Sequence, residues 1–502
     1  MIEQHAILLV VVLPLLAAPL CVLLGRGVLA WTAATLAVWG SFGLSLHLLQ
    51  RVLDEGVLSY MLGGWQAPVG IEYRLDAPGA FVMTIVTAIG AVVLPYSWTS
   101  VRKEVDDHRH HWFYACLLLC FAGLLGMTVT GDAFNLFVFL EISSLSTYVL
   151  VSMGRDRRAL TASFRYLLLG TVGATFYLIG IGFMYLMTGT LNMEDLAVRL
   201  AGTLPDGVTP VVETTTVRAA LAFLSVGVSI KMALFPLHVW LPNVYAYAPS
   251  VVSAFLSATA TKVAILVLLR VFYTVDGKAI AFEALPLADT LVPLAIGGAV
   301  VASFVAIYQR DIKRLLAYSS IAQVGYIVVG IGLATQLGLA AGLLHLFNHA
   351  LMKGALFLAI GCIVYRVGQT RFELLRGVGR QMPLTSAAIV IGGLSLVGVP
   401  MTAGFVSKWA LLDAVLEDGR WITASFILFS SLLSVVYVAQ IVHVLLIRTR
   451  PQDAEPVREA PLWMVLPTLA LALANLWFGL FDAMPGEVAR TAAEALLQEM
   501  QR

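Results

Sequence analysis

The sequence predicts an all-α integral membrane protein of about fourteen transmembrane helices. Three observations lead to this fold class. The chain has 502 residues, of which 60% are hydrophobic and only 12% charged, whereas about 25% of an ordinary soluble domain is charged. Apolar runs of about 20 residues, the length that a helix needs to cross a bilayer, recur along the chain. These runs are rich in Gly and Leu and do not alternate, which favours helices over a β-barrel.

The first predicted span is an uncleaved N-terminal helix. The opening segment, Met1 to His5, lacks the positive charge of a signal peptide, and no small-residue cleavage site follows the apolar run. The fourteen spans lie near residues 5–25, 28–50, 79–99, 112–130, 132–153, 163–187, 217–241, 249–271, 288–308, 315–333, 338–366, 383–414, 421–447 and 461–481.

The distribution of Lys and Arg predicts that both termini lie outside. In that orientation 17 basic residues fall in inner loops and 9 in outer segments, as the positive-inside rule expects. The inner set is Arg26, Arg102, Lys103, Arg109, Arg155, Arg157, Arg158, Arg310, Lys313, Arg314, Arg366, Arg371, Arg376, Arg380, Arg448, Arg450 and Arg458. The outer set is Arg51, Arg74, Arg199, Arg218, Arg270, Lys278, Arg420, Arg490 and Arg502. The net charge of +1 indicates no nucleic-acid partner.

Helix-breaking residues interrupt two of the predicted spans. They are Pro236 and Pro242 in the seventh span, and Gly398, Pro400 and Gly404 in the twelfth. Broken helices at corresponding positions of two halves indicate the repeats of a transporter, although Pro and Gly are also common in membrane helices. The two spans are five apart, which predicts two five-helix units. The predicted domains are 1–111 with the first three spans, 112–271 and 288–447 with the two units, and 448–502 with the last span and the C-terminal tail.

Four of the seven lysines lie inside apolar spans, and Glu141 is the clear acid at the same depth. An ammonium at bilayer depth costs at least roughly 2.5–3.5 kcal/mol on insertion scales, so the four lysines need a functional reason. Lys231 and Lys408 stand beside the two breaks, and Lys262 and Lys353 are predicted on unbroken helices. A chain that excludes charge elsewhere but keeps these groups is typical of a protein that moves charge.

Glu141 and Lys231 are the expected ion pair. Glu141 closes the run FNLFVFLE, and Ser144 and Tyr148 continue a polar stripe on the same helix face. An ion pair opposes the desolvation that a buried ammonium suffers, so a pair that opens and closes would act as a proton switch. A static buried ion pair is the structural alternative, and the sequence leaves it open.

Lys262 is predicted near the bilayer midplane, because it lies over a dozen residues from the start of its span. That depth is too great for its side chain to reach the interface. Hydroxyl side chains of the same segment could support ordered water beside it. They are Ser253, Ser257, Thr259 and Thr261.

A row of titratable groups is predicted in HLFNHALMK, where His345, His349 and Lys353 fall at i, i+4 and i+8. The row extends ~12 Å along one helix face, and His titrates near neutral pH, so it could pass protons between lysines that cannot touch. The two histidines could instead bind a metal, but no carboxylate or cysteine accompanies them, and we expect none. His238, at the first break, is a candidate break partner or relay member.

No cofactor is expected from the cysteines. The four, Cys21, Cys116, Cys120 and Cys362, sit in apolar segments without metal-ligand spacing or an iron–sulfur signature. The chain is therefore expected to have no electron-carrying centre of its own.

Four motifs resemble the proton-conducting antiporter-like membrane subunits. They are GDAFNLFVFLE, KMALFPLHVWLPNVYAYAPSVVSAFLSATATK, HLFNHALMKGALF and PMTAGFVSKW, between residues 130 and 410. This family comprises the antiporter-like subunits of respiratory complex I, membrane-bound hydrogenases and Mrp-type cation/proton antiporters. Within it, the chain looks most similar to the D-type Mrp subunits and their hydrogenase-complex relatives. The chain ends soon after the last span, unlike the longest members, and Lys408 departs from the M-type subunit of complex I, where Glu is expected.

The resemblance implies a fold, a path and partners. The two five-helix repeats are expected to be inverted, with helices 7 and 12 broken. The implied proton path has Glu141 and Lys231 as controlling pair, Lys262 as central relay, His345, His349 and Lys353 as connection, and Lys408 as terminal site. The expected partners are the lipid bilayer, other membrane subunits of an antiporter or respiratory-type complex, protons and, as a further candidate, Na⁺.

The expected function is therefore that of a proton-translocating subunit of a multisubunit Na⁺/H⁺ antiporter in the cell inner (plasma) membrane. The alternative is an antiporter-like proton-pumping subunit of an NADH–quinone oxidoreductase or membrane-bound hydrogenase complex, in which neighbouring subunits catalyse the redox reaction. A stand-alone solute carrier is a weaker candidate, because no substrate-cavity motif stands out.

Overall fold

The computed structural model describes residues 2–204, 209–275, 287–452 and 454–500, so the basic residues Lys278 and Arg502 lie outside it. Thirteen helices in these ranges are long and apolar enough to cross a membrane. They are α1 (Ile2–Leu24), α2 (Gly27–Glu55), α3 (Ala77–Glu104), α4 (His110–Val129), α5 (Ala133–Ser152), α6 (Arg158–Thr188), α8 (Thr215–Met232), the span Ser250–Val275, α12 (Leu287–Ile307), α13 (Ile312–Gly332), α14 (Gln336–Val367), the span Trp421–Ile447 and α18 (Leu462–Leu480). The span Ser250–Val275 comprises α10 (Ser250–Ala258), α11 (Ala260–Leu269) and the π-helix η4 (Arg270–Val275). The span Trp421–Ile447 comprises α17 (Trp421–Val442) and the π-helix η8 (His443–Ile447).

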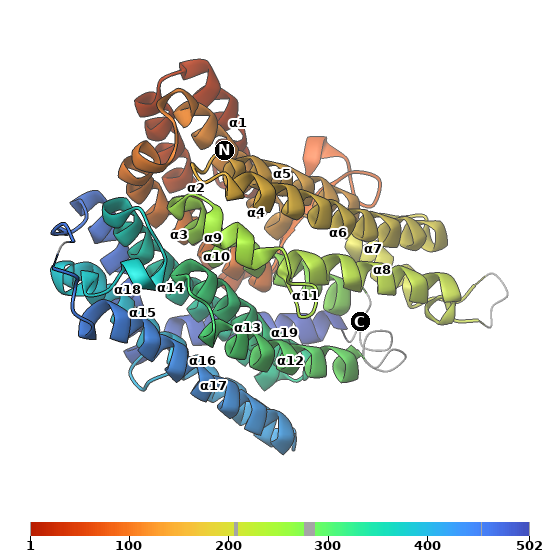
Figure 1. Cartoon of the computed structure of the whole chain (residues 1–502). Helices are drawn as coiled ribbons and strands as arrows, with labels where there is room; N and C mark the ends of the chain where they lie inside the picture. The colour runs from red at the N-terminus through yellow and green to blue at the C-terminus, as the bar shows by residue number, and fades with distance from the viewer. Residues whose placement is uncertain (1, 205–208, 276–286, 453, 501–502) are drawn as a thin grey trace.

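The two predicted helix breaks are present, and with them the fourteen-span fold class is confirmed. The twelfth predicted span consists of two shorter helices, α15 (Pro383–Val397) and α16 (Ala403–Glu417), visible in Figure 1. Gly398 ends α15 with φ 89°, a left-handed conformation that suits glycine. The seventh span stops at Met232, and after a turn the chain continues as α9 (Leu241–Tyr247) with Pro242 in its first turn.

The eighth span is also broken, so the expectation that Lys262 lies on an unbroken helix was wrong. Thr259 separates α10 from α11 with φ −127° and ψ −59°. Its Oγ1 donates to the Phe255 carbonyl at 2.7 Å, one turn back in α10. A hydroxyl that bonds backward in this way bends a helix. Since no Pro or Gly marks the position, local sequence carries no strong breaking signal there.

The helices from α4 to α11 and from α12 to α17 repeat one packing pattern. In the first set α4 packs on α5, α5 on α6, and α6 on the broken helix formed by α8 and α9. In the second set α12 packs on α13, α13 on α14, and α14 on the broken helix formed by α15 and α16. Five crossings separate corresponding helices, so the second set runs in the opposite direction through the bundle. The domain boundaries 112–271 and 288–447 remain predictions.

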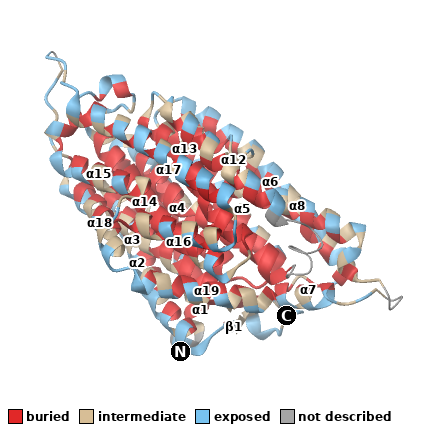
Figure 2. Cartoon of the chain, turned by 90° about the horizontal axis from the view of Figure 1, so that it is seen from below, coloured by how far each residue is buried: buried red, intermediate tan, exposed pale blue. Residues whose placement is uncertain are grey.

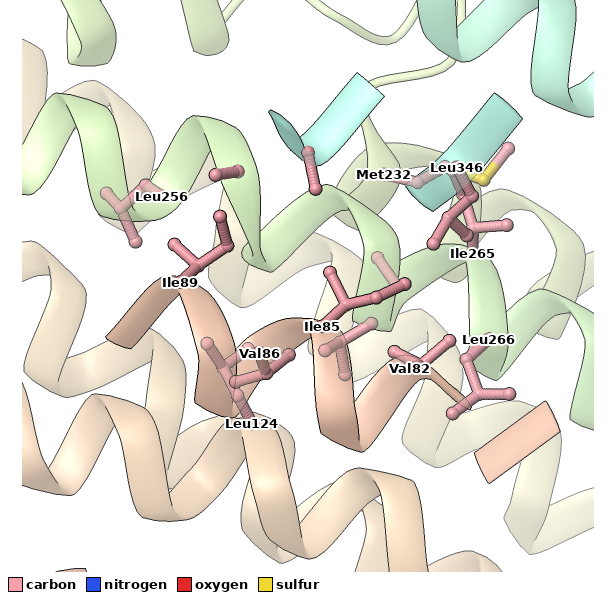
Figure 3. Close-up of a cluster of buried hydrophobic side chains, with 14 of the residues drawn as sticks. Val82, Ile85, Val86, Ile89, Leu124, Met232, Leu256, Ile265, Leu266 and Leu346 are labelled. Atoms are coloured by element: carbon pink, nitrogen blue, oxygen red, sulfur yellow. The ribbon is translucent and has the colours of Figure 1, made fainter. Parts of the chain in front are cut away.

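The interior of the bundle is formed by α3, α4, α10–α11, α13 and α14. In α13, 94% of the most apolar stretch is buried, against 28% in α2 at the periphery, and Figure 2 shows the buried residues concentrated around α14 and its neighbours. Figure 3 shows how α3 packs in this core. Val82, Ile85, Val86 and Ile89 of α3 lie among Leu124, Leu256, Ile265 and Leu266 of α4, α10 and α11.

A small cap covers one end of the bundle. It contains the antiparallel strands β1 (Leu58–Met61) and β2 (Glu72–Leu75), α7 (Met193–Leu200) and α19 (Ala483–Met500). The predicted C-terminal tail is thus a helix, which packs on α14 and α3. The remaining short elements are the 3₁₀-helices η1 (Leu62–Gly64), η2 (Asp107–Arg109), η3 (Val211–Glu213), η6 (Phe372–Leu374) and η7 (Val378–Gln381).

A buried ion pair and a hydrogen bond to Glu499 hold this cap to the end of the eighth span. Arg270 Nη2 donates to Asp76 Oδ1 at 2.6 Å, while Glu499 of α19 accepts from Arg74 Nη1 at 2.7 Å and from Thr274 Oγ1 at 2.8 Å. Burial opposes ionisation of Asp76, but the Arg270 guanidinium outweighs it and holds the pKa of Asp76 below its usual range.

Candidate functional site

Glu141 on α5 and Lys231 on α8 face each other, as the sequence predicted. Their Oε1 and Nζ atoms are 3.7 Å apart, but the ammonium donates its hydrogen bond to Ser144 Oγ, at 2.8 Å. Glu141 Oε1 is buried and has no hydrogen-bond partner among the described residues. Lys231 also lies in the last turn of α8, where the helix dipole favours a cation. The two groups therefore form an ion pair without a direct hydrogen bond between them.

A cavity of about 40 Å³ adjoins Lys231 and reaches the eighth span. Its polar walls are Ser143, Ser144 and Tyr166, and α11 contributes Ala260 and Ala264. This volume has room for a few water molecules, and the polar groups supply the partners that such waters need. The cavity places water-accessible space between Lys231 and the helix that carries Lys262.

Lys262 is fully buried and uses the break in its own span. Its Nζ donates to the Ser257 carbonyl on the α10 side of the break, and to Thr261 Oγ1 at 3.3 Å. The interruption at Thr259 lets the ammonium bond to a carbonyl one turn before it. No acidic side chain forms an ion pair with Lys262 in the described part of the chain.

His345 and His349 lie parallel on α14, with ring centroids 6.5 Å apart. His345 is held on both sides, because its Nδ1 is hydrogen-bonded to Ser407 Oγ at 2.9 Å and its Nε2 to Gln323 Oε1 at 3.0 Å. His349 is fully buried, and neither of its ring nitrogens has a hydrogen-bond partner in the described ranges. An imidazole with two unsatisfied nitrogens can both accept and donate a proton, which suits a relay.

Lys353, two turns beyond His345, reaches across to α13. Its Nζ donates to the Leu316 carbonyl at 3.0 Å and to Ser319 Oγ. Lys353 is fully buried. Like Lys262, it is solvated by neutral oxygens and forms no ion pair with an acid in the residues described.

Lys408, on α16, is bound at the second predicted break. Its Nζ donates to the last carbonyls of α15, Leu396 at 2.9 Å and Val397 at 3.1 Å, and to Ser431 Oγ at 3.1 Å. It also lies 5.1 Å from the centre of the Tyr326 ring, a cation–π distance. The C-terminal carbonyls of a helix carry its negative dipole, so the break itself builds a cation site.

Three groups on α13 were not singled out from the sequence. Ser319, Gln323 and Tyr326 fall at i, i+4 and i+7 and contact Lys353, His345 and Lys408 in turn. Their helical spacing within an apolar run is the sequence signal that could have identified them. His238, at the first break, stacks on Phe235 with ring centroids 5.4 Å apart, and its role as break partner or relay member stays a prediction. No cluster of three or more His, Cys, Asp or Glu side chains with metal-binding geometry occurs in the described residues.

Comparison with known proteins identifies the family. The protein-family model described as "NADH:quinone oxidoreductase/Mrp antiporter, TM" matches residues 130–434 of this chain. The chain belongs to this family. The matched region contains all seven residues of the predicted path.

Relatives that match most of the chain come from two kinds of complex. The chain is 40% identical to NADH-quinone oxidoreductase subunit N of Desulforudis audaxviator, over 95% of this chain and 96% of that one. It is 32% identical to the D-type subunit of the Na(+)/H(+) antiporter of Alkalihalophilus pseudofirmus, over 81% and 79%. A chain in the structure of the Mrp complex from Dietzia sp. superposes with a TM-score of 0.90 at 26% identity, covering 99% of this chain and 98% of that one. The chain is thus a multi-pass membrane protein of a family whose members work in multisubunit membrane complexes.

Proposed function

We propose that this chain is the proton-translocating membrane subunit of a multisubunit Na⁺/H⁺ antiporter. The observation that carries the proposal is the line of buried cations and histidines from Glu141 to Lys408, which crosses from one five-helix set to the other. Lys262, Lys353 and Lys408 are held by carbonyl and hydroxyl oxygens. A lysine without a carboxylate partner is free to exist with or without its proton, because burial destabilises the charged form.

The proposed path assigns each group one step. Protons load Lys262, pass along α14 through Lys353, His349 and His345, and leave through Lys408. Glu141 and Lys231 set the barrier: while the pair is closed, Lys231 keeps its proton, and when it opens, the nearby 40 Å³ cavity gives that proton a water to enter. Gaps longer than a hydrogen bond are bridged by water. Na⁺ is the proposed coupling cation, handled by partner subunits.

Proton pumping by everted membrane vesicles that contain the complete complex tests this proposal. In Glu141→Ala and Lys231→Ala we expect the initial rate to fall at least about tenfold, because each variant removes one half of the switch. The amount of assembled complex, measured by immunoblot, is the control for folding. Unchanged pumping with normal assembly would remove the basis of the proposal.

The second candidate is the antiporter-like subunit of an NADH–quinone oxidoreductase or membrane-bound hydrogenase complex. The 40% identity to a subunit of an NADH-quinone oxidoreductase favours it, and the same path would then be driven by redox chemistry in neighbouring subunits. Purification of the chain with its native partners separates the two candidates. Iron–sulfur or flavin subunits would favour the redox complex, and a set of small membrane subunits would favour the antiporter.

We also propose the plasma membrane as its location, with both termini outside. The 17-to-9 distribution of basic residues supports this orientation. A protease-sensitive tag at the C-terminus should be cleaved from outside in intact spheroplasts and be protected in everted vesicles.

A further inference from the structure

Lys313 is a fifth buried lysine, outside the path described above. The sequence places it in an inner loop, but it is the second residue of α13 and is only 3% exposed. Its Nζ donates to the Ala248 carbonyl at the end of α9, at 3.2 Å. No acidic side chain forms an ion pair with it in the described part of the chain, so this ammonium is buried at a considerable desolvation cost.

A cavity of about 300 Å³ joins Lys313 to the surface at the arginine-rich end of the bundle. Its walls run from the exposed residues Lys103 and Arg155 to the buried Lys313. Glu104 lines the same cavity and is fixed by Ser250, whose backbone N–H and Oγ donate to it at 2.8 and 3.0 Å. The volume holds several waters, so a buried lysine and a fixed carboxylate share one solvated space.

Lys313 leads inward along α13. Leu316 and Ser319 follow it at i+3 and i+6, which is roughly 4.5 and 9 Å along the helix. The Leu316 carbonyl accepts from Lys353 at 3.0 Å and from Ser319 Oγ at 2.9 Å. The Leu316 carbonyl, which follows Lys313 on this helix face, is therefore the group that binds Lys353.

A second route leads inward along α10. The Ala248 carbonyl that binds Lys313 also lies 3.4 Å from Ser253 Oγ, whose shortest hydrogen bond, at 2.8 Å, goes to the Tyr245 carbonyl. Ser257 stands one turn further on, and its carbonyl holds Lys262. Lys313 thus sits where two polar lines diverge, one toward Lys353 and one toward Lys262.

We propose that Lys313 is a further proton-transfer residue and that the 300 Å³ cavity beside it is the entrance to the path from the arginine-rich end. Lys313 takes a proton from water in the cavity and passes it to water beside Ser253 or Ser319, returning to its starting state. This inference rests on the proposed function, because it presupposes that Lys262 and Lys353 exchange protons.

The competing role for Lys313 is purely structural: its ammonium satisfies the Ala248 carbonyl. Two substitutions separate the roles. Lys313→Gln retains a donor for that carbonyl but carries no exchangeable charge, and Lys313→Arg retains both donor and charge but does not release its proton. Arg376→Gln is the control for the loss of a basic side chain, since Arg376 is exposed and does not line the cavity.

The test is the initial rate of proton pumping by everted vesicles containing the complete complex, per amount of assembled complex. We expect both Lys313 variants to be slowed at least about tenfold, with Arg376→Gln at the unmodified rate. Normal rates in both variants, or a loss in Lys313→Gln that Lys313→Arg restores, would overturn the inference. If Glu141→Ala and Lys231→Ala are inactive in the same assay, the proposed function stands even then. If those two also pump normally, the proposed function itself fails.

Discussion

At the scale of residues, the chemistry of the path lies in how its cations are held. Lys231 has a carboxylate at 3.7 Å, whereas Lys262, Lys353 and Lys408 are bound by carbonyls and hydroxyls of the protein. Neutral oxygens stabilise an ammonium less than a carboxylate does. Among the described residues, Glu141 is the acid that forms an ion pair with a lysine of the path, Lys231, which suits a single control point.

Gln323 tests whether the hydrogen-bonded position of His345 matters. Gln323→Leu removes the acceptor of His345 Nε2 and leaves a buried nitrogen unpaired, which costs about 1–3 kcal/mol of unfolding free energy. We also expect pumping per assembled complex to fall about tenfold, because His345 loses the group that orients its ring. Thermal unfolding in detergent and the vesicle assay measure the two effects.

The matched control is Gln336→Leu, the same substitution at the start of α14, where the amide donates to Glu494 on the surface. We expect it to pump normally. Equal rates for Gln323→Leu and Gln336→Leu would show that Gln323 supports only the fold.

At the scale of elements, helix breaks create the lysine sites. The gap between α15 and α16 exposes the carbonyls that bind Lys408, and the break at Thr259 does the same for Lys262. The break between α15 and α16 was predictable because Gly398 and Pro400 are helix-breaking residues. The break at Thr259 was not predictable, because this residue lies in an ordinary apolar run. The sequence does not show that its hydroxyl donates to the carbonyl one turn back in the helix.

Gly398 provides a test of the second predicted break. It has φ 89°, and a Cβ added there would lie 3.0 Å from Lys408 Cδ. We expect Gly398→Ala to lower the unfolding free energy by about 1–2 kcal/mol from backbone strain, and also to displace Lys408 and slow pumping about tenfold. Gly419→Ala is the control, because Gly419 has φ 72° with nothing within 4 Å. Both variants should lose stability, and an equal pumping rate in the two would contradict the role given to Lys408.

At the scale of the whole molecule, two oppositely running five-helix sets each contribute two lysines to the predicted path. The spans, the predicted breaks and the pairing of Glu141 with Lys231 could be predicted, because charge in an apolar run is visible in a sequence. The roles of Ser407, Gln323 and Lys313 could not, because their partners come from other helices. In particular, the end of α9 buries Lys313, and local sequence does not report that packing. The seven path residues remain predictions as proton carriers.

The proposed path depends on Lys262 as its central relay. The substitution Lys262→Met removes the charge of this side chain. Methionine fills a similar volume without that charge, so the bundle should assemble normally. The measurement is the initial rate of proton pumping by everted vesicles with equal amounts of complete complex. We predict a rate below about one tenth of that of the unmodified protein. An unchanged rate would mean that protons cross without the central lysine, and the proposed path would then be wrong.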